Sequence, residues 1–242
     1  MGLKYYCDES FFDTWSVEMA YVLGYLYADG SIDDVSYNRG KYMRVTSTDV
    51  DRIDLIRKLL SSKHTILKEV RGGNRKPKYV LQIGSHRLYE ALTRLGVTPH
   101  KSLTMKLPVV PHKFFGSFVC GYFDGDGCAY IERRKLASGR IGYGRLTIIF
   151  TSGSKDFLAS LHDTFREHEV VRGNGLYKHS NGSAHQLRYL TQDSLRLFSM
   201  MYGGREMKDL YLKRKYAIFT QYFDAKPNVV NQSALTFGLM AK

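Results

Sequence analysis

A nine-residue segment that occurs twice limits the possible folds of this chain more than any other feature. Val22–Gly30 reads VLGYLYADG, and Val119–Gly127 reads VCGYFDGDG, at an offset of 97 residues. Each copy is followed, in the same order, by strand, helix, strand and helix patterns. Such self-similarity indicates that one structural unit has been duplicated. The 242 residues therefore predict an α+β fold in two halves, each built as helix, two strands, helix, two strands and helix.

The boundary between the halves is predicted at a proline-containing linker. Lys106–Pro111 reads KLPVVP, where two prolines end the preceding element and stiffen the connection. We therefore expect an N-terminal domain of residues 1–107 and a C-terminal domain of residues 108–242, joined at about residues 106–111. Each half is long enough to bury its own hydrophobic core.

The charge of the chain favours a polyanionic partner. It has 36 Lys and Arg against 23 Asp and Glu, a formal net charge of +13 spread over both halves, so both halves are expected to contact a polyanion. Three cysteines without a CxxC pair disfavour a disulfide framework and a zinc ribbon. The sequence shows neither a membrane-spanning apolar run nor a leader with basic-then-apolar order. We expect no membrane partner and a cytoplasmic location, or an organellar matrix if the gene is organellar.

The repeated segment has a stripe of small residues when it is read as a helix. Glycine inside a helix costs roughly 1 kcal/mol relative to alanine, so this stripe needs a reason. Close approach of another backbone is the usual reason, and we expect the partner to be the other copy of the same helix, related by a pseudo-twofold axis. The small positions are Ala20, Gly24 and Ala28 in the first copy and Ser117, Gly121 and Gly125 in the second.

Each copy ends in Asp-Gly, at Asp29–Gly30 and at Asp126–Gly127. The glycine is expected, because the residue after a helix often adopts a positive φ. A carboxylate in the last turn faces the negative end of the helix dipole, which is unfavourable by about 0.3–1 kcal/mol. Bound divalent cations would remove this penalty, and Mg²⁺ prefers one or two carboxylates completed by water and phosphate oxygens. A single Asp-Gly is usually only a turn, but two at equivalent places in a basic, duplicated chain predict a metal site.

The two segments resemble the signature helices of the LAGLIDADG homing endonucleases, in the single-chain form with two motifs. The resemblance extends from about Trp15 to about Phe223. It implies two pseudo-symmetric αββαββα domains forming a β-saddle over DNA, in a monomer with internal pseudo-twofold symmetry. It also implies Mg²⁺-dependent hydrolysis of both strands of a long duplex site, leaving 3′ overhangs. We expect Mn²⁺ to substitute, and Ca²⁺ to bind without supporting cleavage.

The resemblance also assigns roles to individual residues. The metal-binding acid of the family, the second aspartate of the motif, maps onto Asp29 and Asp126, and the preceding carbonyls of Ala28 and Gly125 map onto further metal ligands.

An earlier acid of the motif differs between the copies: Tyr27 replaces it in the first, whereas Asp124 keeps it in the second, which implies an asymmetric site. The family places a basic residue near each scissile phosphate. Similar segments of this chain point to Lys101 and, in preference to Lys213, to Lys215 as catalytic residues.

Alternation along the predicted strands separates an inward apolar set from an outward set rich in hydrogen-bond donors. Basic loops lie between these strands. A single residue of this kind is more often simply solvated, but the recurrence of such loops in both halves predicts phosphate contacts with duplex DNA, and hence a steep salt dependence. The predicted DNA-binding residues are Arg39, Lys41, Arg44, Arg71, Arg75, Lys76, Lys78, Gln82, Arg133, Arg134, Lys135, Arg140, Arg145, Lys178, Gln186 and Arg188.

Two other functions stay open at this level. The chain could be an RNA maturase that assists splicing of an intron, with intron RNA as its partner, or a DNA-binding regulator without catalysis. Both motif acids are intact, which favours the nuclease over the regulator but does not exclude the maturase. A splicing assay and a metal-dependent plasmid-linearisation assay separate the three.

Overall fold

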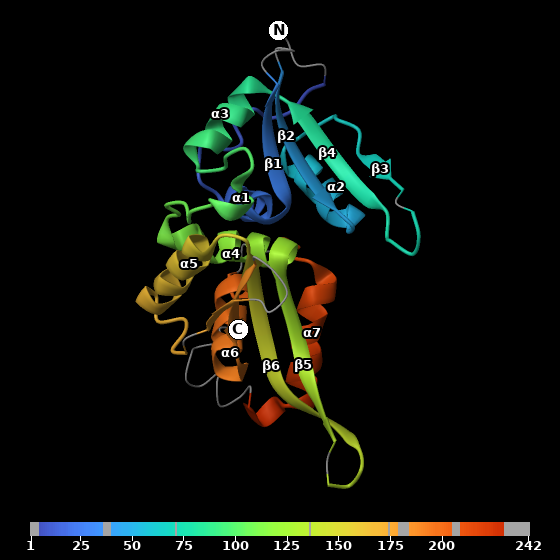
Figure 1. Ribbon diagram of the computed structural model, residues 1–242, viewed down its shortest axis with the longest axis vertical. Helices are drawn as coiled ribbons and strands as arrows, with labels where there is room; N and C mark the ends of the chain where they lie inside the picture. Colours follow the sequence, from blue (N-terminus) through green and yellow to red (C-terminus); the bar gives the residue numbers. More distant parts are fainter. Residues whose placement is uncertain are drawn as a thin grey trace. The chain divides into compact units, whose positions relative to one another are not determined.

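Two four-stranded antiparallel sheets, each accompanied by helices, make up the structure (Figure 1). The computed structural model describes residues 5–35, 40–70, 72–135, 137–173, 175–178, 184–204 and 209–229. By its internal contacts the chain divides into two compact units, residues 1–125 and 126–242. Within the described residues, no helix has the length and apolar character needed to cross a membrane.

The first unit contains one sheet in the strand order β1-β2-β4-β3. Helices α1 and α2 both contact strands of this sheet, and α3 packs against β2. The elements are α1 (Val17–Asp29), β1 (Gly30–Val35), β2 (Gly40–Ser47), α2 (Val50–Leu59), β3 (Leu67–Glu69), β4 (Lys78–Gly84), α3 (His86–Arg94), the 3-10 helix η2 (Lys101–Leu103) and α4 (His112–Asp126).

The second unit repeats this order, with its strands arranged β5-β6-β8-β7. Together with α4, its elements give a second αββαββ succession closed by α6, so the predicted duplication and fold class are confirmed. A further helix, α7, packs against β5 and β6. The elements are β5 (Gly127–Lys135), β6 (Ile141–Ser152), α5 (Lys155–Glu167), β7 (Leu176–Lys178), β8 (His185–Tyr189), α6 (Thr191–Tyr202) and α7 (Lys213–Ala225).

Alternation of side chains gives the first sheet one buried face and one partly exposed, open face, whereas in β6 of the second sheet Thr147 and Ile149 of the opposite alternation are buried as well. Apolar residues at every second position of the central strands have no exposed surface, because they pack beneath the helices. The residues between them in β4 and at the start of β6 are polar or partly exposed. The fully buried set is Met43, Val45, Leu81 and Ile83 in the first sheet and Leu146, Ile148, Phe150 and Leu187 in the second.

Helices α1 and α4 pack backbone to backbone, as the small-residue stripe predicts. A Cβ atom on Gly24 would overlap the carbonyl oxygen of Phe118, and one on Gly121 would overlap the carbonyl oxygen of Tyr21. These contacts are reciprocal in the repeat, since Tyr21 and Phe118 are 97 residues apart. They also place α4 in the first compact unit up to Gly125. The boundary near residue 107 follows the repeat rather than these contacts and stays a prediction.

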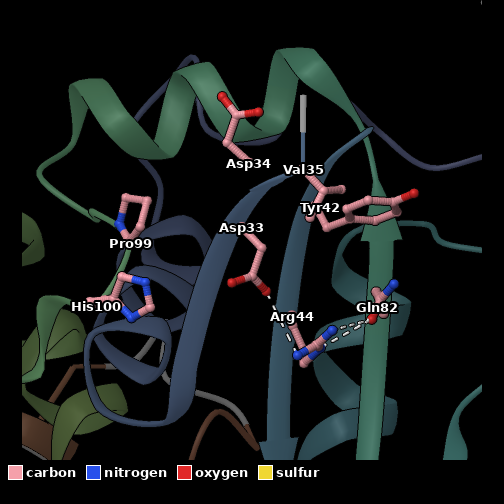
Figure 2. Close-up of a pocket in the computed structure, with 8 residues that line it drawn as sticks. All are labelled: Asp33, Asp34, Val35, Tyr42, Arg44, Gln82, Pro99 and His100. Carbon is pink, nitrogen blue, oxygen red and sulfur yellow. Dashed lines mark hydrogen bonds and ion pairs between the residues drawn. The ribbon is translucent and has the colours of Figure 1, made fainter. Parts of the chain in front are cut away.

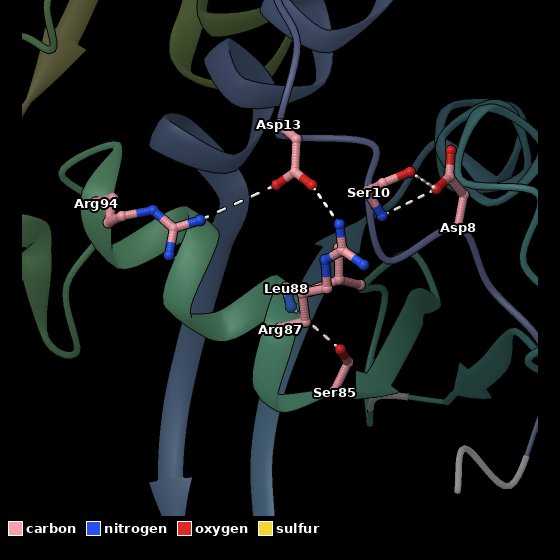
Figure 3. Close-up of polar contacts among 7 residues, drawn as sticks. All are labelled: Asp8, Ser10, Asp13, Ser85, Arg87, Leu88 and Arg94. Atoms are coloured by element: carbon pink, nitrogen blue, oxygen red, sulfur yellow. Dashed lines mark hydrogen bonds and ion pairs between the residues drawn. The ribbon is translucent and has the colours of Figure 1, made fainter.

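The N-terminal segment holds α3 in place within the first unit (Figure 3). Asp13 pairs with Arg87 at 2.5 Å and with Arg94 at 4.0 Å, two arginines one heptad apart on α3. Ser85 caps the helix, because its Oγ accepts from the backbone N–H of Leu88 at 3.1 Å. The chain after α3 leads directly to η2, where the first predicted catalytic lysine lies.

Candidate active site

Two buried lysines make the same contact in the two units. Lys101 Nζ donates to the carbonyl oxygen of Gly30 at 2.6 Å, and Lys215 Nζ donates to that of Gly127, also at 2.6 Å. The two lysines are only 6% and 4% exposed. Each acceptor glycine directly follows a motif aspartate in the sequence. The structure therefore brings each predicted lysine to the end of a signature helix, the place where the chain turns from helix into strand.

Different local structures deliver the two lysines. His100 adopts the left-handed conformation, with φ 56°, and turns the chain into the short helix η2 that begins with Lys101. The backbone N–H of Met105 closes this turn on the carbonyl oxygen of Lys101 at 2.8 Å. Lys215 instead lies in the first turn of α7, which packs against β5. The two halves thus reach one contact by unrelated backbone geometries.

The motif aspartates end the two signature helices, and strands β1 and β5 begin at the next residue. Gly30 has φ −99° and ψ 158°, so the predicted positive φ at this position is wrong. Space explains the glycine instead, because a Cβ on Gly30 would lie 2.6 Å from the carbonyl oxygen of Leu26. The helix can therefore pass into the strand without a loop.

Gly125 shows how closely α4 approaches the first motif. A Cβ atom on Gly125 would overlap the Cβ of Ala28 and lie 3.5 Å from Oδ2 of Asp29. The first copy of the motif has alanine at the equivalent position. The absence of a side chain at Gly125 therefore lets Ala28 pack directly against α4, close to the Asp29 carboxylate.

The residues present fit a hard cation better than a soft one. Within the described part of the chain, no three His, Cys, Asp or Glu side chains gather into a metal-binding group. A zinc site needs three or four protein ligands, whereas Mg²⁺ is held by one or two carboxylates and completes its shell with water and phosphate oxygens. The partly exposed carboxylate of Asp29 is a ligand of the kind that meets this smaller requirement. The metal-ligand assignments of Asp29, of Asp126 and of the Ala28 and Gly125 carbonyls stay predictions.

The motif helices differ in one pair of side-chain contacts. Tyr21 Oη donates to Oδ2 of Asp124 at 2.7 Å, and both side chains are buried. At the repeat-equivalent positions, Tyr27 packs edge-on against Phe118 with ring centroids 5.4 Å apart. The hydroxyl of Tyr27 points elsewhere and donates to the carbonyl oxygen of Leu95 at 2.8 Å. The earlier motif acid is thus a buried interface residue in the second motif, and a tyrosine takes its place in the first.

Arg52 of α2 joins this contact and was not identified from the sequence. It is 7% exposed, hydrogen-bonds to Tyr21 and lies where its charge attracts Asp124. Burial and the nearby Asp124 charge hold the pKa of Tyr21 well above its ordinary value, so the hydroxyl remains a donor. The sequence did hint at its burial. Arg52 is the third residue after the N-cap of α2, and the third residue after the N-cap of α5 is Phe157, which is buried.

Tyr25 connects the end of α1 to the start of α2. Its hydroxyl donates to Ser47 Oγ at 2.9 Å, and the same oxygen accepts from the backbone N–H of Asp49 at 3.0 Å. Burial, followed by the charge of Asp29, raises the pKa of Tyr25 above its ordinary value. Ser47 therefore supports the turn into α2 beside the candidate site.

Predicted DNA-binding residues of the first unit fall on both faces of the sheet. Arg44 and Gln82 are cross-strand neighbours on the open face and hydrogen-bond to each other. Lys41 belongs to the opposite alternation of β2 and contacts α3, with Nζ 3.4 Å from Glu90 and 4.9 Å from the ring centre of Tyr89. Strand alternation separates it from Arg44, which a one-dimensional reading of basic residues did not show.

In the second unit, arginines of the predicted set are linked by an acid. Two hydrogen bonds lower the pKa of Glu132 to about 2, and the one from Arg134 contributes more than the one from Arg145. On β8, Arg188 lies over the ring of Tyr177 and is exposed. Arg39 and Arg71 lie outside the described residues. Exposed or partly exposed members of the set also include Arg75, Lys76, Lys78, Arg133, Lys135, Arg140, Lys178 and Gln186.

The sequence matches no protein-family model and no curated protein. Solved structures do match the fold. The I-LtrWI LAGLIDADG homing endonuclease bound to target DNA matches with a TM-score of 0.55 at 10% identity, over 95% of this chain and 96% of that chain. The LAGLIDADG meganuclease I-AabMI bound to uncleaved DNA matches with a TM-score of 0.52 at 12% identity, over 90% of this chain and 95% of that chain. Meganuclease I-SmaMI bound to uncleaveable DNA matches with a TM-score of 0.51 at 14% identity, over 92% of this chain and 98% of that chain.

These similarities span nearly the whole length of both partners in each comparison. The chain therefore has the fold of the single-chain LAGLIDADG homing endonucleases, as its two motifs predict. At identities of 10–14% the likeness establishes the fold. The chemistry has to be argued from the residues of this chain.

Proposed function

We propose that this protein is a site-specific DNA endonuclease that hydrolyses both strands of a long duplex target and leaves 3′ overhangs. The observation that carries the proposal is the repeated contact of a buried lysine with the carbonyl that follows each motif aspartate. A single such contact could serve only to satisfy a carbonyl group. Its recurrence through two different backbone geometries indicates selection for a cation at the end of each signature helix.

The chemistry follows from where charge develops. Attack of water on a phosphodiester builds negative charge on the phosphoryl oxygens and on the leaving 3′ oxygen. Asp29 and Asp126 would hold divalent metal ions, which when bound supply a more acidic water and electrostatic stabilisation of these oxygens. Lys101 and Lys215 place a positive charge at the carbonyl that follows each aspartate. The glycine at position 125 lets α4 approach Ala28 closely, next to the Asp29 carboxylate.

We expect Mg²⁺ to be the working ion, Mn²⁺ to substitute, and Ca²⁺ to permit binding without cleavage. I-SmaMI is described as bound to an uncleaved DNA target in the presence of calcium ions, which supports this last expectation. Variants of I-SmaMI in which lysine is replaced by alanine are also among the matched structures. They supply precedent for testing lysines on this fold.

Duplex DNA is the proposed partner of a monomer that uses both halves. The net charge of +13 and the exposed basic residues near both sheets would neutralise phosphates, so affinity should fall steeply with salt. The matched structures are described with DNA, which favours the nuclease over an intron-RNA maturase. Retention of both motif acids favours it over a silent regulator.

Selection of cleaved sites from a randomised duplex library in Mg²⁺, with a parallel binding selection in Ca²⁺, tests the proposal. The selected site is then placed in a plasmid, and linearisation is timed for Asp29→Asn and for Asp126→Asn. We expect each to lower the rate at least about a hundredfold, because loss of a metal holder removes several kcal/mol of charge stabilisation. Asp163→Asn, at an exposed position of α5, is the matched control and should cut normally. Cutting of both strands at the wild-type rate by Asp29→Asn would overturn the metal assignment.

A further inference from the structure

A polar pocket lies on the open face of the first sheet, where β1, β2 and β4 run side by side (Figure 2). Its volume is about 500 Å³, and one wall is formed by His100, the residue before Lys101. Asp33, Arg44 and Gln82 come from the three strands and meet at the base of the pocket. This trio has a hydrogen-bonding pattern that restricts what it can bind.

The other two residues of the trio, Gln82 and Asp33, hold the guanidinium of Arg44. Its Nε and one Nη atom donate to Oε1 of Gln82 at 3.0 and 2.8 Å, and its other Nη atom lies 3.7 Å from Oδ2 of Asp33. A guanidinium has five N–H donors, of which Gln82 takes two. Even if Asp33 takes one more, each Nη atom keeps an N–H for an incoming acceptor. Arg44 therefore presents a fork of two donors in a fixed orientation.

Gln82 is restricted by the same contact. Arginine has no acceptor, so only the amide oxygen of Gln82 can face it, and that oxygen receives two hydrogen bonds. A glutamine that reads adenine must accept from N6 and donate to N7 at once. Because its acceptor is occupied, Gln82 can offer only donors to a base and cannot make the adenine contact.

Asp33 disfavours a phosphate at this position. Its carboxylate is on the same face as Arg44, with 39% of its side chain exposed, and would repel the oxygens of a nucleic-acid backbone. A base edge carries no formal charge and avoids this cost. The trio therefore suits a base with two neighbouring acceptors, which in the major groove is guanine through O6 and N7.

We propose that Arg44 reads a guanine in one half of the DNA target, with Gln82 and Asp33 as the residues that position it. The inference rests on the proposed function and adds base identity to it. Arg44 of β2 lies opposite Ser31 of β1, and Ser31 is two residues after Asp29. Because this places Arg44 near the predicted metal ligand, the guanine should lie within roughly 5 base pairs of the cleaved bond in that half-site.

The second unit does not repeat the trio. Counted from the glycine that begins each first strand, the positions equivalent to Arg44 and Gln82 are Ile149 and Arg188, which are also cross-strand neighbours. Ile149 is 8% exposed and cannot donate a hydrogen bond from its side chain. The prediction made from Arg44 therefore concerns one half-site, and the second unit offers the exposed Arg188 in a different arrangement.

A binding selection on randomised duplex DNA in Ca²⁺, run on the full chain and its variants, tests the inference. Wild type should select guanine at one position that Arg44→Lys no longer specifies, with the preference over other bases falling roughly tenfold to a hundredfold. Gln82→Met and Asp33→Asn should weaken the preference for guanine at that same position. Wild type should not select adenine there. Lys78→Gln, on the same strand as Gln82, is the control and should reduce affinity for all sites alike.

The outcomes separate this inference from the proposed function. If wild type cleaves a selected site and Arg44→Lys leaves every base preference unchanged, Arg44 does not read a base and only this inference fails. A uniform loss of affinity with a shallower salt dependence would show Arg44 to be a phosphate contact, with the same consequence. If wild type selects no sequence at all, both proposals fail. Thermal melting of each variant shows whether a change in preference reflects altered folding.

Discussion

Tyr21 of α1 donates a 2.7 Å hydrogen bond to the buried carboxylate of Asp124 on α4. At the equivalent positions of the repeat, Phe118 faces Tyr27. The hydroxyl is thus present where the opposing residue is a carboxylate and absent where it is an aromatic ring. Two duplicated helices have diverged in pairs across their contact, because a buried carboxylate without a donor is costly whereas two rings pack without one.

Removing the hydroxyl of Tyr21 should destabilise the fold. Tyr21→Phe takes a hydrogen bond from a buried carboxylate, and we expect a loss of about 1–3 kcal/mol in the free energy of unfolding, measured by urea denaturation. Tyr27→Phe removes a hydroxyl that donates to a main-chain carbonyl and should cost only about 1 kcal/mol. Equal losses in the two variants would contradict a special role for the carboxylate.

Adding a methyl group at the helix contact should be far more harmful than elsewhere. Gly24→Ala and Gly121→Ala each place a Cβ atom on a main-chain carbonyl of the other helix, which cannot rotate away. We expect each to lower the free energy of unfolding by about 3 kcal/mol or more. Gly72→Ala is the control, because no atom lies within 4 Å of its Cβ position. Unfolding midpoints that match wild type would show that α1 and α4 are not in backbone contact.

Replacing Lys101, the first of the two lysines proposed to be catalytic, should separate binding from cleavage. Lys101→Met removes the positive charge at the Gly30 carbonyl while keeping most of the side-chain volume, so cleavage in Mg²⁺ should fall by roughly tenfold or more. Binding of the selected site in Ca²⁺ should change little. The carbonyl of Gly30 loses its donor, so a stability cost of about 1–3 kcal/mol is also expected.

Lys63→Met, at an exposed position, provides the charge-matched control for this experiment. A Lys101→Met protein that is folded and cuts at the rate of Lys63→Met would reduce the role of Lys101 to holding the main chain.

Stability should decline in mild acid because of a buried histidine. Burial lowers the pKa of His162 below its ordinary value of 6.5, and its Nδ1 lies 2.7 Å from Tyr189 Oη. Since the folded pKa is the lower one, the unfolded chain takes up the proton first. The contribution of neutral His162 to the free energy of unfolding is therefore fully present above pH 6.5, and it falls as the pH drops from there towards the folded pKa.

The measurement compares urea midpoints at pH 7.5 and 5.5. His162→Gln keeps a polar partner for Tyr189 but does not titrate, so its midpoint should fall less than that of wild type. His64, whose pKa burial also lowers, should account for part of the remaining change. An identical decrease in both proteins would exclude His162 as a source.

The sequence by itself determined the features that depend on repetition and period. The duplicated motif predicted the αββαββα order, the stripe through Gly24 and Gly121 predicted contact between the helices, and alternation in β4 predicted its buried face. Such patterns are local or periodic, so they can be read without knowing which distant residues meet. Lys101 and Lys215, chosen by resemblance, each contact the carbonyl that follows a motif aspartate, and their catalytic role stays a prediction.

Only the tertiary structure decided which polar groups share an environment. Arg52 lies beside Tyr21, and Asp33 beside Arg44, through packing of helices and strands that no spacing in the sequence encodes. Lys41 was separated from the open face for the same reason. The cost of burying a charge or an unpaired donor depends on every neighbour in three dimensions, whereas helix and strand periods depend only on the chain itself.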